Sequence, residues 1–316
     1  MRLSSLAAAI LLLTLPPCMA AAQSLQGALE WLPRGSLNLH DLTTRPAEML
    51  SGETPSGEKQ SFYAEYGRLA FRSPDILGGN ARKAGLSCQA CHANGHVSSG
   101  FFIPGLSGKP GEVDLSNALW HARAENQRFD PRKIPSLRGV LNKPRFGFDD
   151  RSPSLREFTR EVIVVEFAGA EPDPLLLDSL IAYLRLLQPT DAPDAAIGLR
   201  GELADLARFS RLLILPLAEE DAALSRRIAE MLRGQIGFVH ERMAGEALAA
   251  QRDLLEQWGR SLRAIAELAE AGEWIAARSR RAELEAALNA PPRPLLDAEA
   301  ASLYAPERLA AWLKQR

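Results

Sequence analysis

The residues best suited to chemistry lie in one short stretch, GLSCQACHANGH, which runs from Gly85 to His96. It contains the thiols of Cys88 and Cys91 and the imidazoles of His92 and His96. Thiols and imidazoles at such spacings can ligate zinc, form a redox-active pair or attach a haem. Each of these uses needs a different structural setting, so the flanking sequence has to decide between them.

Zinc and thioredoxin-like redox chemistry fit this stretch poorly. A structural zinc site needs four convergent ligands, but His92 directly follows Cys91, and adjacent side chains diverge too much to meet at one small ion. The chain also has no second C-x-x-C or H-x-x-x-H pair. A thioredoxin-like pair requires a strand leading into a helix, and the flanks NARKAGLS and ANGHVSSG contain no strand pattern.

The remaining interpretation is the C-x-x-C-H attachment motif of c-type haem. Cys88 and Cys91 stand three residues apart, so on a first helical turn both thiols can reach the vinyl groups of one porphyrin and form thioethers. His92 then projects beneath the ring and ligates the iron as the proximal ligand. The motif therefore predicts one covalently bound haem c, with the two cysteines as the tether.

The N-terminus has the pattern of a cleaved secretory signal peptide over residues 1–22. Arg2 precedes an apolar run over residues 6–15, and Ala20 and Ala22 form a small-residue exit. The run is shorter than the roughly 20 residues of a membrane-spanning helix, so an uncleaved anchor is disfavoured. Lipidation of Cys18 is a further alternative, disfavoured by the proline before it. We therefore predict a periplasmic protein without a transmembrane span after cleavage.

Cleavage also removes one of the three cysteines and leaves only Cys88 and Cys91 in the mature chain. An exported protein with two cysteines in a C-x-x-C pair has no disulfide framework, so another chemistry must use these thiols. A net charge of −2 gives no basis for a nucleic-acid partner. The 316 residues, 46% of them hydrophobic, are enough for a full core and for two domains.

Composition divides the chain into an N-terminal arm (23–66), a haem domain (67–189) and a helical bundle (190–316). The segment SFYAEYGRLAF predicts a short helix just ahead of the motif. Two further helices are signalled inside the haem domain. One can be capped by Ser152 or Ser154, with Glu157 three residues after Ser154 as in a capping box, and the other begins at Asp173 and Pro174.

After Pro193 the sequence is rich in Ala, Leu, Glu and Arg, and its apolar residues recur at steps of three and four. This pattern predicts a bundle of four or five helices. No long alternating strand pattern is present. The predicted fold class is therefore mainly α, with a cytochrome c-like haem domain followed by a helical bundle.

From about Tyr66 to Leu187 the sequence resembles the second haem domain of the bacterial di-haem cytochrome c peroxidase and MauG family. The matching segments are LGGNARKAGLSCQACH, KIPSLRGV, FGFDDRSPSLREFTREVIVVEFAG and LLDSLIAYLRLL. The family counterparts are a C-x-x-C-H, a P-[ST]-L-R-N segment, an H-D-G turn and a helix that begins S-L. The resemblance implies a c-type haem domain and redox chemistry, and covers just over a third of the chain.

Two departures limit what the resemblance implies. Peroxidases of this family carry two C-x-x-C-H sites, one haem for chemistry and one for electron delivery, and this chain has cysteines for one. The family's H-D-G histidine is replaced by Asp149, and the helix that often supplies a distal methionine offers Glu161 and Val162 instead. The distal ligand of the iron is therefore left open.

His121 is the leading candidate for that distal ligand, because its segment LWHARAE can fold over the far side of the ring. His96 lies four residues after His92, hence on the same helical face, and is expected to contact a propionate or the surface instead. An open or water-bound iron is the alternative to a protein ligand. Other candidates in the flanking segments are Met49, Met231, Met243 and His240, and the candidates for holding the haem propionates are Arg138, Arg151 and Arg156.

The leading functional hypothesis is one-electron transfer by an exported mono-haem cytochrome between periplasmic redox partner proteins. A second hypothesis is a peroxidase-like enzyme that relies on a partner for the second haem. A third is a haem-based sensor or docking protein in which the bundle binds the partner. The sequence predicts no oligomeric state and assigns no catalytic residue.

Overall fold

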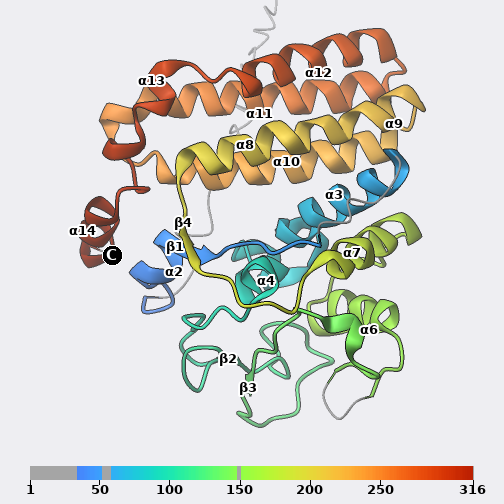
Figure 1. The fold of residues 1–316 in the computed structure, drawn as a ribbon, viewed down its shortest axis with the longest axis vertical. Coiled ribbons are helices and arrows are strands. Elements are labelled where there is room, and N and C mark those ends of the chain that lie inside the picture. Colours follow the sequence, from blue (N-terminus) through green and yellow to red (C-terminus); the bar gives the residue numbers. More distant parts are fainter. Residues whose placement is uncertain (1–33, 52–57, 148–150, 316) are drawn as a thin grey trace, which may run out of the picture.

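A computed structural model describes residues 34–51, 58–147 and 151–315. The predicted signal peptide and Asp149 lie outside these described residues. The chain is mainly α, as the sequence predicts. Figure 1 shows long helices of the C-terminal part stacked on a smaller helical part, beyond which extend the loops that carry β2 and β3.

The described chain up to residue 196 alternates short helices with loops. Its helices and strands are α2 (Leu39–Thr43), β1 (Thr44–Pro46), α3 (Glu58–Arg72), α4 (Gly79–Lys83), α5 (Cys88–Cys91), β2 (Glu112–Val113), β3 (Arg132–Lys133), α6 (Leu155–Glu161), a π-helical turn (Val162–Glu166), α7 (Pro174–Leu186) and β4 (Asp194–Ala196). Short 3₁₀ turns include Pro74–Ile76, Ala93–Gly95 and Val140–Asn142.

The C-terminal part is the predicted helical bundle. Its helices are α8 (Leu199–Ser210), α9 (Ile214–Ala218), α10 (Ala222–Arg242), α11 (Ala249–Glu270), α12 (Trp274–Asn289), α13 (Arg293–Leu296) and α14 (Pro306–Gln315). Helix α10 packs along α11, α11 along α12, and α12 against α8 (Figure 1). None of the described helices is both long and apolar enough to cross a bilayer.

Side-chain caps explain where helices α6 and α7 begin. The Ser154 hydroxyl accepts a hydrogen bond from the backbone N–H of Glu157 at 3.3 Å, which caps α6. The Asp173 carboxylate accepts from the backbone N–H of Leu176 at 2.9 Å, and Pro174 occupies the first turn of α7. Both side chains satisfy N–H groups that the helix leaves unpaired, so these two predicted starts are confirmed.

Helices α3 and α7 cross at close range and form the core beneath the motif. A Cβ added to Gly67 would lie 1.8 Å from the Ser179 carbonyl oxygen, so only glycine permits this approach. The rings of Phe71 and Tyr183 pack beside the crossing with centroids 5.2 Å apart. Since α3 continues to residue 72, the boundary predicted at residue 66 falls inside a core helix, and the arm ends before α3.

The arm and the bundle are joined on the far side of the motif. Strand β1 pairs antiparallel with β4, with Thr44 opposite Ala196. Buried apolar side chains form one continuous cluster that extends from Phe62 in α3 to Tyr304 near the C-terminus. The part of the chain that holds α3–α7 and the bundle therefore share a core.

Candidate functional site

The two cysteines of the motif mark the two ends of α5. The backbone N–H of His92 donates to the Cys88 carbonyl at 2.8 Å, so Cys88, Cys91 and His92 belong to one helical turn. Cys88 and Cys91 are half-buried, and their thiols do not form a disulfide. Helix α5 packs against α3, so the α3–α7 crossing supports this turn.

One hydrogen bond determines the orientation and the tautomer of His92. Its Nδ1 lies 2.9 Å from the carbonyl oxygen of Pro135, which can only accept. Nδ1 must therefore carry the proton, and Nε2 keeps its lone pair. Histidines that ligate metals generally donate their second ring N–H to a carbonyl or carboxylate in this way.

Burial sets the protonation states of the three motif residues. Desolvation raises the pKa of Cys88 and of Cys91 to about 12, so neither thiol forms a thiolate at neutral pH. Desolvation lowers the pKa of His92 to about 4, against the opposing effect of its bond to Pro135, so the imidazole is neutral. Neutral imidazole is the form that binds iron, whereas a thioredoxin-like pair depends on an acidic thiol.

Within residues 34–51, 58–147 and 151–315, no group of three or more His, Cys, Asp or Glu side chains is placed to hold a metal ion.

His96 differs from its prediction in two respects. Asn94 has φ +51°, so the chain between His92 and His96 is not a continuous helix and the same-face argument fails. His96 is buried rather than at the surface, with a hydrogen bond to the backbone of Ala47 in the arm. Burial, followed by the charge of Arg138, lowers the pKa of this imidazole.

His121 also donates to a backbone carbonyl. Its Nδ1 lies 2.7 Å from the carbonyl oxygen of Val165 in the π-helical turn, so Nδ1 is the donor and Nε2 takes no part in this bond. The segment is held in place by Trp120, which is buried and packs edge-on against Phe167 at 5.5 Å. The π-helical turn directly follows α6.

The other candidate ligands lie in different surroundings. Met231 and Met243 are buried in the core. His240 Nε2 lies 3.5 Å from Glu256 in the neighbouring helix α11. These three side chains have ordinary packing roles in the bundle. Met49 lies in the arm, where its carbonyl accepts from the backbone N–H of Gln188.

The three arginines considered for propionate binding also separate. Arg151 pairs with two glutamates, and Arg156 pairs with Asp178 at 2.8 Å on the surface. Arg138 is half-buried, contacts the exposed Asp191 at 2.8 Å, and has a buried Nε without a hydrogen bond to any described residue. The preceding residue, Leu137, donates its backbone N–H to Gly95 beside the motif. Arg138 is therefore the best placed of the three to bind a carboxylate near α5.

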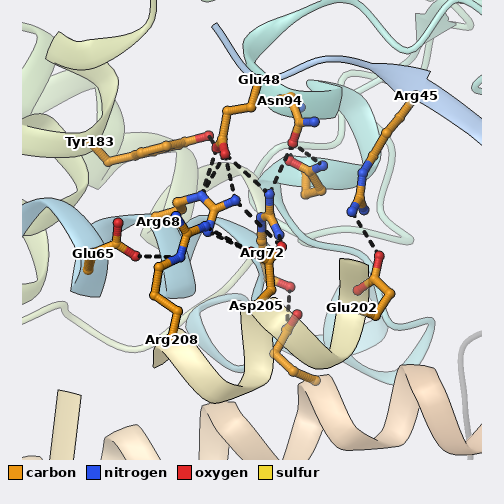
Figure 2. Close-up of polar contacts among 12 residues, drawn as sticks. Arg45, Glu48, Glu65, Arg68, Arg72, Asn94, Tyr183, Glu202, Asp205 and Arg208 are labelled. Atoms are coloured by element: carbon orange, nitrogen blue, oxygen red, sulfur yellow. Dashed lines mark hydrogen bonds and ion pairs between the residues drawn. The ribbon is translucent and has the colours of Figure 1, made fainter. Parts of the chain in front are cut away.

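A buried cluster of charged residues lies between the arm, α3 and α8 (Figure 2). This charge cluster consists of Glu48 from the arm, Arg68 and Arg72 from α3, and Asp205 from α8. Arg68 lies 2.6 Å from Glu48 and 3.1 Å from Asp205, and Arg72 lies 2.5 Å from Asp205. The two arginine side chains are only 6% and 5% exposed. Both guanidinium groups also lie against the ring of Phe209.

The charges in this cluster stabilise one another. Burial alone would raise the pKa of Glu48, but the hydrogen bond from Arg68 and the charges of Arg72 and Arg68 hold it below its ordinary value. The Tyr183 hydroxyl donates to Glu48 at 2.6 Å and adds to this effect. Glu65, at the edge of the cluster, has its pKa raised because its burial outweighs the charge of Arg68. The members of this cluster are far apart along the chain, so no local sequence pattern predicts it.

A cavity of about 260 Å³ lies beside α5, on the face that carries Gln89 and Ala90. Its lining includes Gln89, Ala90 and Ala93 together with residues of the arm, and it includes none of the three motif residues Cys88, Cys91 and His92. This cavity is therefore separate from the proposed attachment site.

No protein-family model, curated protein or solved structure matches the chain. The class of protein that the structure establishes is a mainly α chain with a shared core. Its function has to be argued from its own residues.

Proposed function

We propose that this chain is an exported mono-haem c-type cytochrome that transfers single electrons between redox partner proteins in the periplasm. The observation that carries the proposal is the His92–Pro135 hydrogen bond, which leaves Nε2 free in a residue that directly follows two tethering cysteines. The unpaired, protonated thiols of Cys88 and Cys91 support the same assignment.

In this proposal each residue of the motif has a separate task. Cys88 and Cys91 hold the haem by thioethers, His92 binds its iron through Nε2, and Arg138 offers a donor for a propionate. When bound, the haem supplies a one-electron carrier whose iron alternates between the ferric and ferrous states. The Pro135 carbonyl holds the His92 ring in one orientation during that change.

The hydrogen bond between His121 Nδ1 and the Val165 carbonyl favours electron transfer over peroxidase chemistry. We propose that His121 binds the distal face through Nε2, because its Nδ1 is already committed to Val165. An iron with two histidine ligands has no open position for peroxide. The peroxidase-like alternative would need an open iron and a second haem from a partner.

The experiment that tests the proposed function is expression of the full chain in a bacterium that attaches c-type haem. We expect a periplasmic protein that begins near Gln23 by mass spectrometry and gives a haem-stained band on a denaturing gel. A pyridine haemochrome spectrum should show one haem per chain. A mature protein in the periplasm that carries no covalent haem would contradict the proposal.

The His121→Ala variant is expected to change the coordination of the iron without loss of the covalent haem. The unmodified protein should have a low-spin ferric spectrum that cyanide and azide leave unchanged, and the variant should become high-spin and bind both. His40→Ala is the control, because His40 is exposed, pairs with Asp194 and lines a cavity that includes none of Cys88, Cys91 and His92.

Two outcomes of that experiment would exclude His121 as the ligand. A variant that stays low-spin assigns the distal position to another group. An unmodified protein that is high-spin and forms an oxidised intermediate with peroxide favours the peroxidase-like alternative.

A further inference from the structure

The turn that follows His92 is fixed by the side chain of Asn94. This residue is buried in a left-handed conformation, with φ +51°. Its Oδ1 accepts from Arg72 Nη2 at 3.2 Å and from Gln89 Nε2 at 2.9 Å, and its Nδ2 donates to the Pro46 carbonyl at 2.8 Å. The amide side chain is therefore bonded at both ends, and the turn has one preferred position.

Arg72 connects this turn to the bundle. Its Nη2 bonds Asn94, while its Nη1 lies 2.5 Å from Asp205 in α8 (Figure 2). The carbonyl of Arg72 also accepts a hydrogen bond from Gln235 in α10 at 3.1 Å. A continuous chain of polar contacts thus runs from α8 through one buried guanidinium to the second residue after His92.

We infer that Arg72 is a positioning residue for the turn that carries His92 and that Asp205 holds Arg72 in place. The helical bundle thereby positions the backbone of the proximal haem ligand, whose ring is bonded to Pro135. This inference rests on the proposed function, since it assumes that His92 binds iron. It gives the bundle a role in the haem site although no described bundle residue belongs to the C-x-x-C-H motif.

The chemistry of arginine explains why this position suits a relay. The planar guanidinium presents donors in a fixed fork, so it can bond Asn94 and Asp205 at the same time, whereas a lysine ammonium on a flexible stem lacks that geometry. A buried guanidinium also requires its carboxylate, because a charge left unpaired in the interior is strongly unfavourable. The groups that accept a hydrogen bond from the ring of a metal-binding histidine fix its orientation, and their loss typically weakens metal binding or activity.

The competing interpretation is that the charge cluster only joins the bundle to the haem domain. The chain offers a matched control for this, the Arg45–Glu202 ion pair at 2.8 Å. It also links the arm to α8, and the carboxylates of Glu202 and Asp205 are each 18% exposed. No hydrogen bond or ion pair in the described structure joins the Arg45–Glu202 pair to Asn94.

The test is proton NMR of the ferric holoprotein, in which the hyperfine-shifted haem methyl resonances depend on the orientation of the axial histidine. We expect Arg72→Lys and Asp205→Asn to change the spread of these resonances, and Glu202→Gln to retain the pattern of the unmodified protein. Redox titration should show a shift of the midpoint potential to more positive values in Asp205→Asn, because a buried negative charge is removed.

A gentler variant covers the case in which Asp205→Asn does not fold. Asn94→Gly keeps the left-handed backbone that the turn requires and removes only the side-chain bonds. It should reproduce the methyl pattern of Arg72→Lys, and the double variant should show no further change, because both substitutions interrupt one path.

Two results separate the failure of this inference from that of the proposed function. Folded, haem-loaded Arg72→Lys and Asn94→Gly proteins that keep the unmodified methyl pattern would overturn the relay alone. An unmodified chain that carries no covalent haem would overturn the proposed function and this inference with it.

Discussion

Replacing both Cys88 and Cys91 by alanine is expected to abolish the haem stain of the protein on a denaturing gel. Only a covalent bond survives denaturation, and the one other cysteine of the sequence, Cys18, lies in the predicted signal peptide. Each single variant should keep one thioether and a weaker stain. In the double variant His92 remains, so any haem bound to the native protein is held by coordination alone and should be lost on unfolding.

Ala90→Ser is the matched control for the cysteine variants. Ala90 lies between the two cysteines on α5 but faces the cavity on the other side of the helix, so this substitution should leave the stain at full strength. A double cysteine variant that keeps a full stain would show that the haem is attached elsewhere.

Replacing Arg68 by methionine is expected to lower the free energy of unfolding by about 3–5 kcal/mol, the usual cost of removing one partner from a buried ion pair. Arg68 is the main partner of Glu48 and also contacts Asp205, and its side chain is 6% exposed. Methionine preserves most of the volume, so the loss reports the unpaired carboxylates. Urea denaturation followed by circular dichroism measures the change.

Arg45→Met is the control for this prediction. The Arg45–Glu202 pair joins the arm to α8 without α3 and is more exposed, since its arginine side chain is 25% exposed. Its loss should cost no more than about 1 kcal/mol, as for other solvent-accessible pairs. Equal losses in the two variants would mean that the buried cluster contributes no more than an ordinary surface pair.

The stability of the unmodified protein should also depend on pH through Glu48. Its pKa is lower in the folded protein than its ordinary value of 4.5, so its contribution is present above that value and is lost as the pH falls towards the folded pKa. In Arg68→Met the buried carboxylate loses its main partner, and acid then relieves an unfavourable charge. The difference in unfolding free energy between the two proteins should therefore narrow below pH 4.5.

The mainly α class and several element positions were predictable because they depend on local chemistry. Each of the caps, Ser154 and Asp173, accepts from a backbone N–H only three residues further along the chain. The periodic apolar residues after Pro193 form the bundle. The haem motif is equally local, since its residues share one turn.

Contacts distant in sequence were not predictable from the same patterns. The carbonyl that orients His92 lies 43 residues further along the chain, and the one that orients His121 lies 44 residues further. A backbone carbonyl carries no side-chain signal. The left-handed backbone of Asn94 interrupts the helix expected between His92 and His96. Helix α3 spans the boundary predicted at residue 66. Both features depend on packing rather than on periodicity.

The spacing between Arg72 and Asp205 has a consequence for the biogenesis of the protein. The two residues are 133 positions apart, and the motif lies between them in sequence, close to Arg72. In the proposed export the chain emerges from its N-terminus, so the thiols of Cys88 and Cys91 reach the periplasm well before α8 does. On the proposed function, haem would be attached to Cys88 and Cys91 before α8 could pack against α3, and the docking of the bundle would follow.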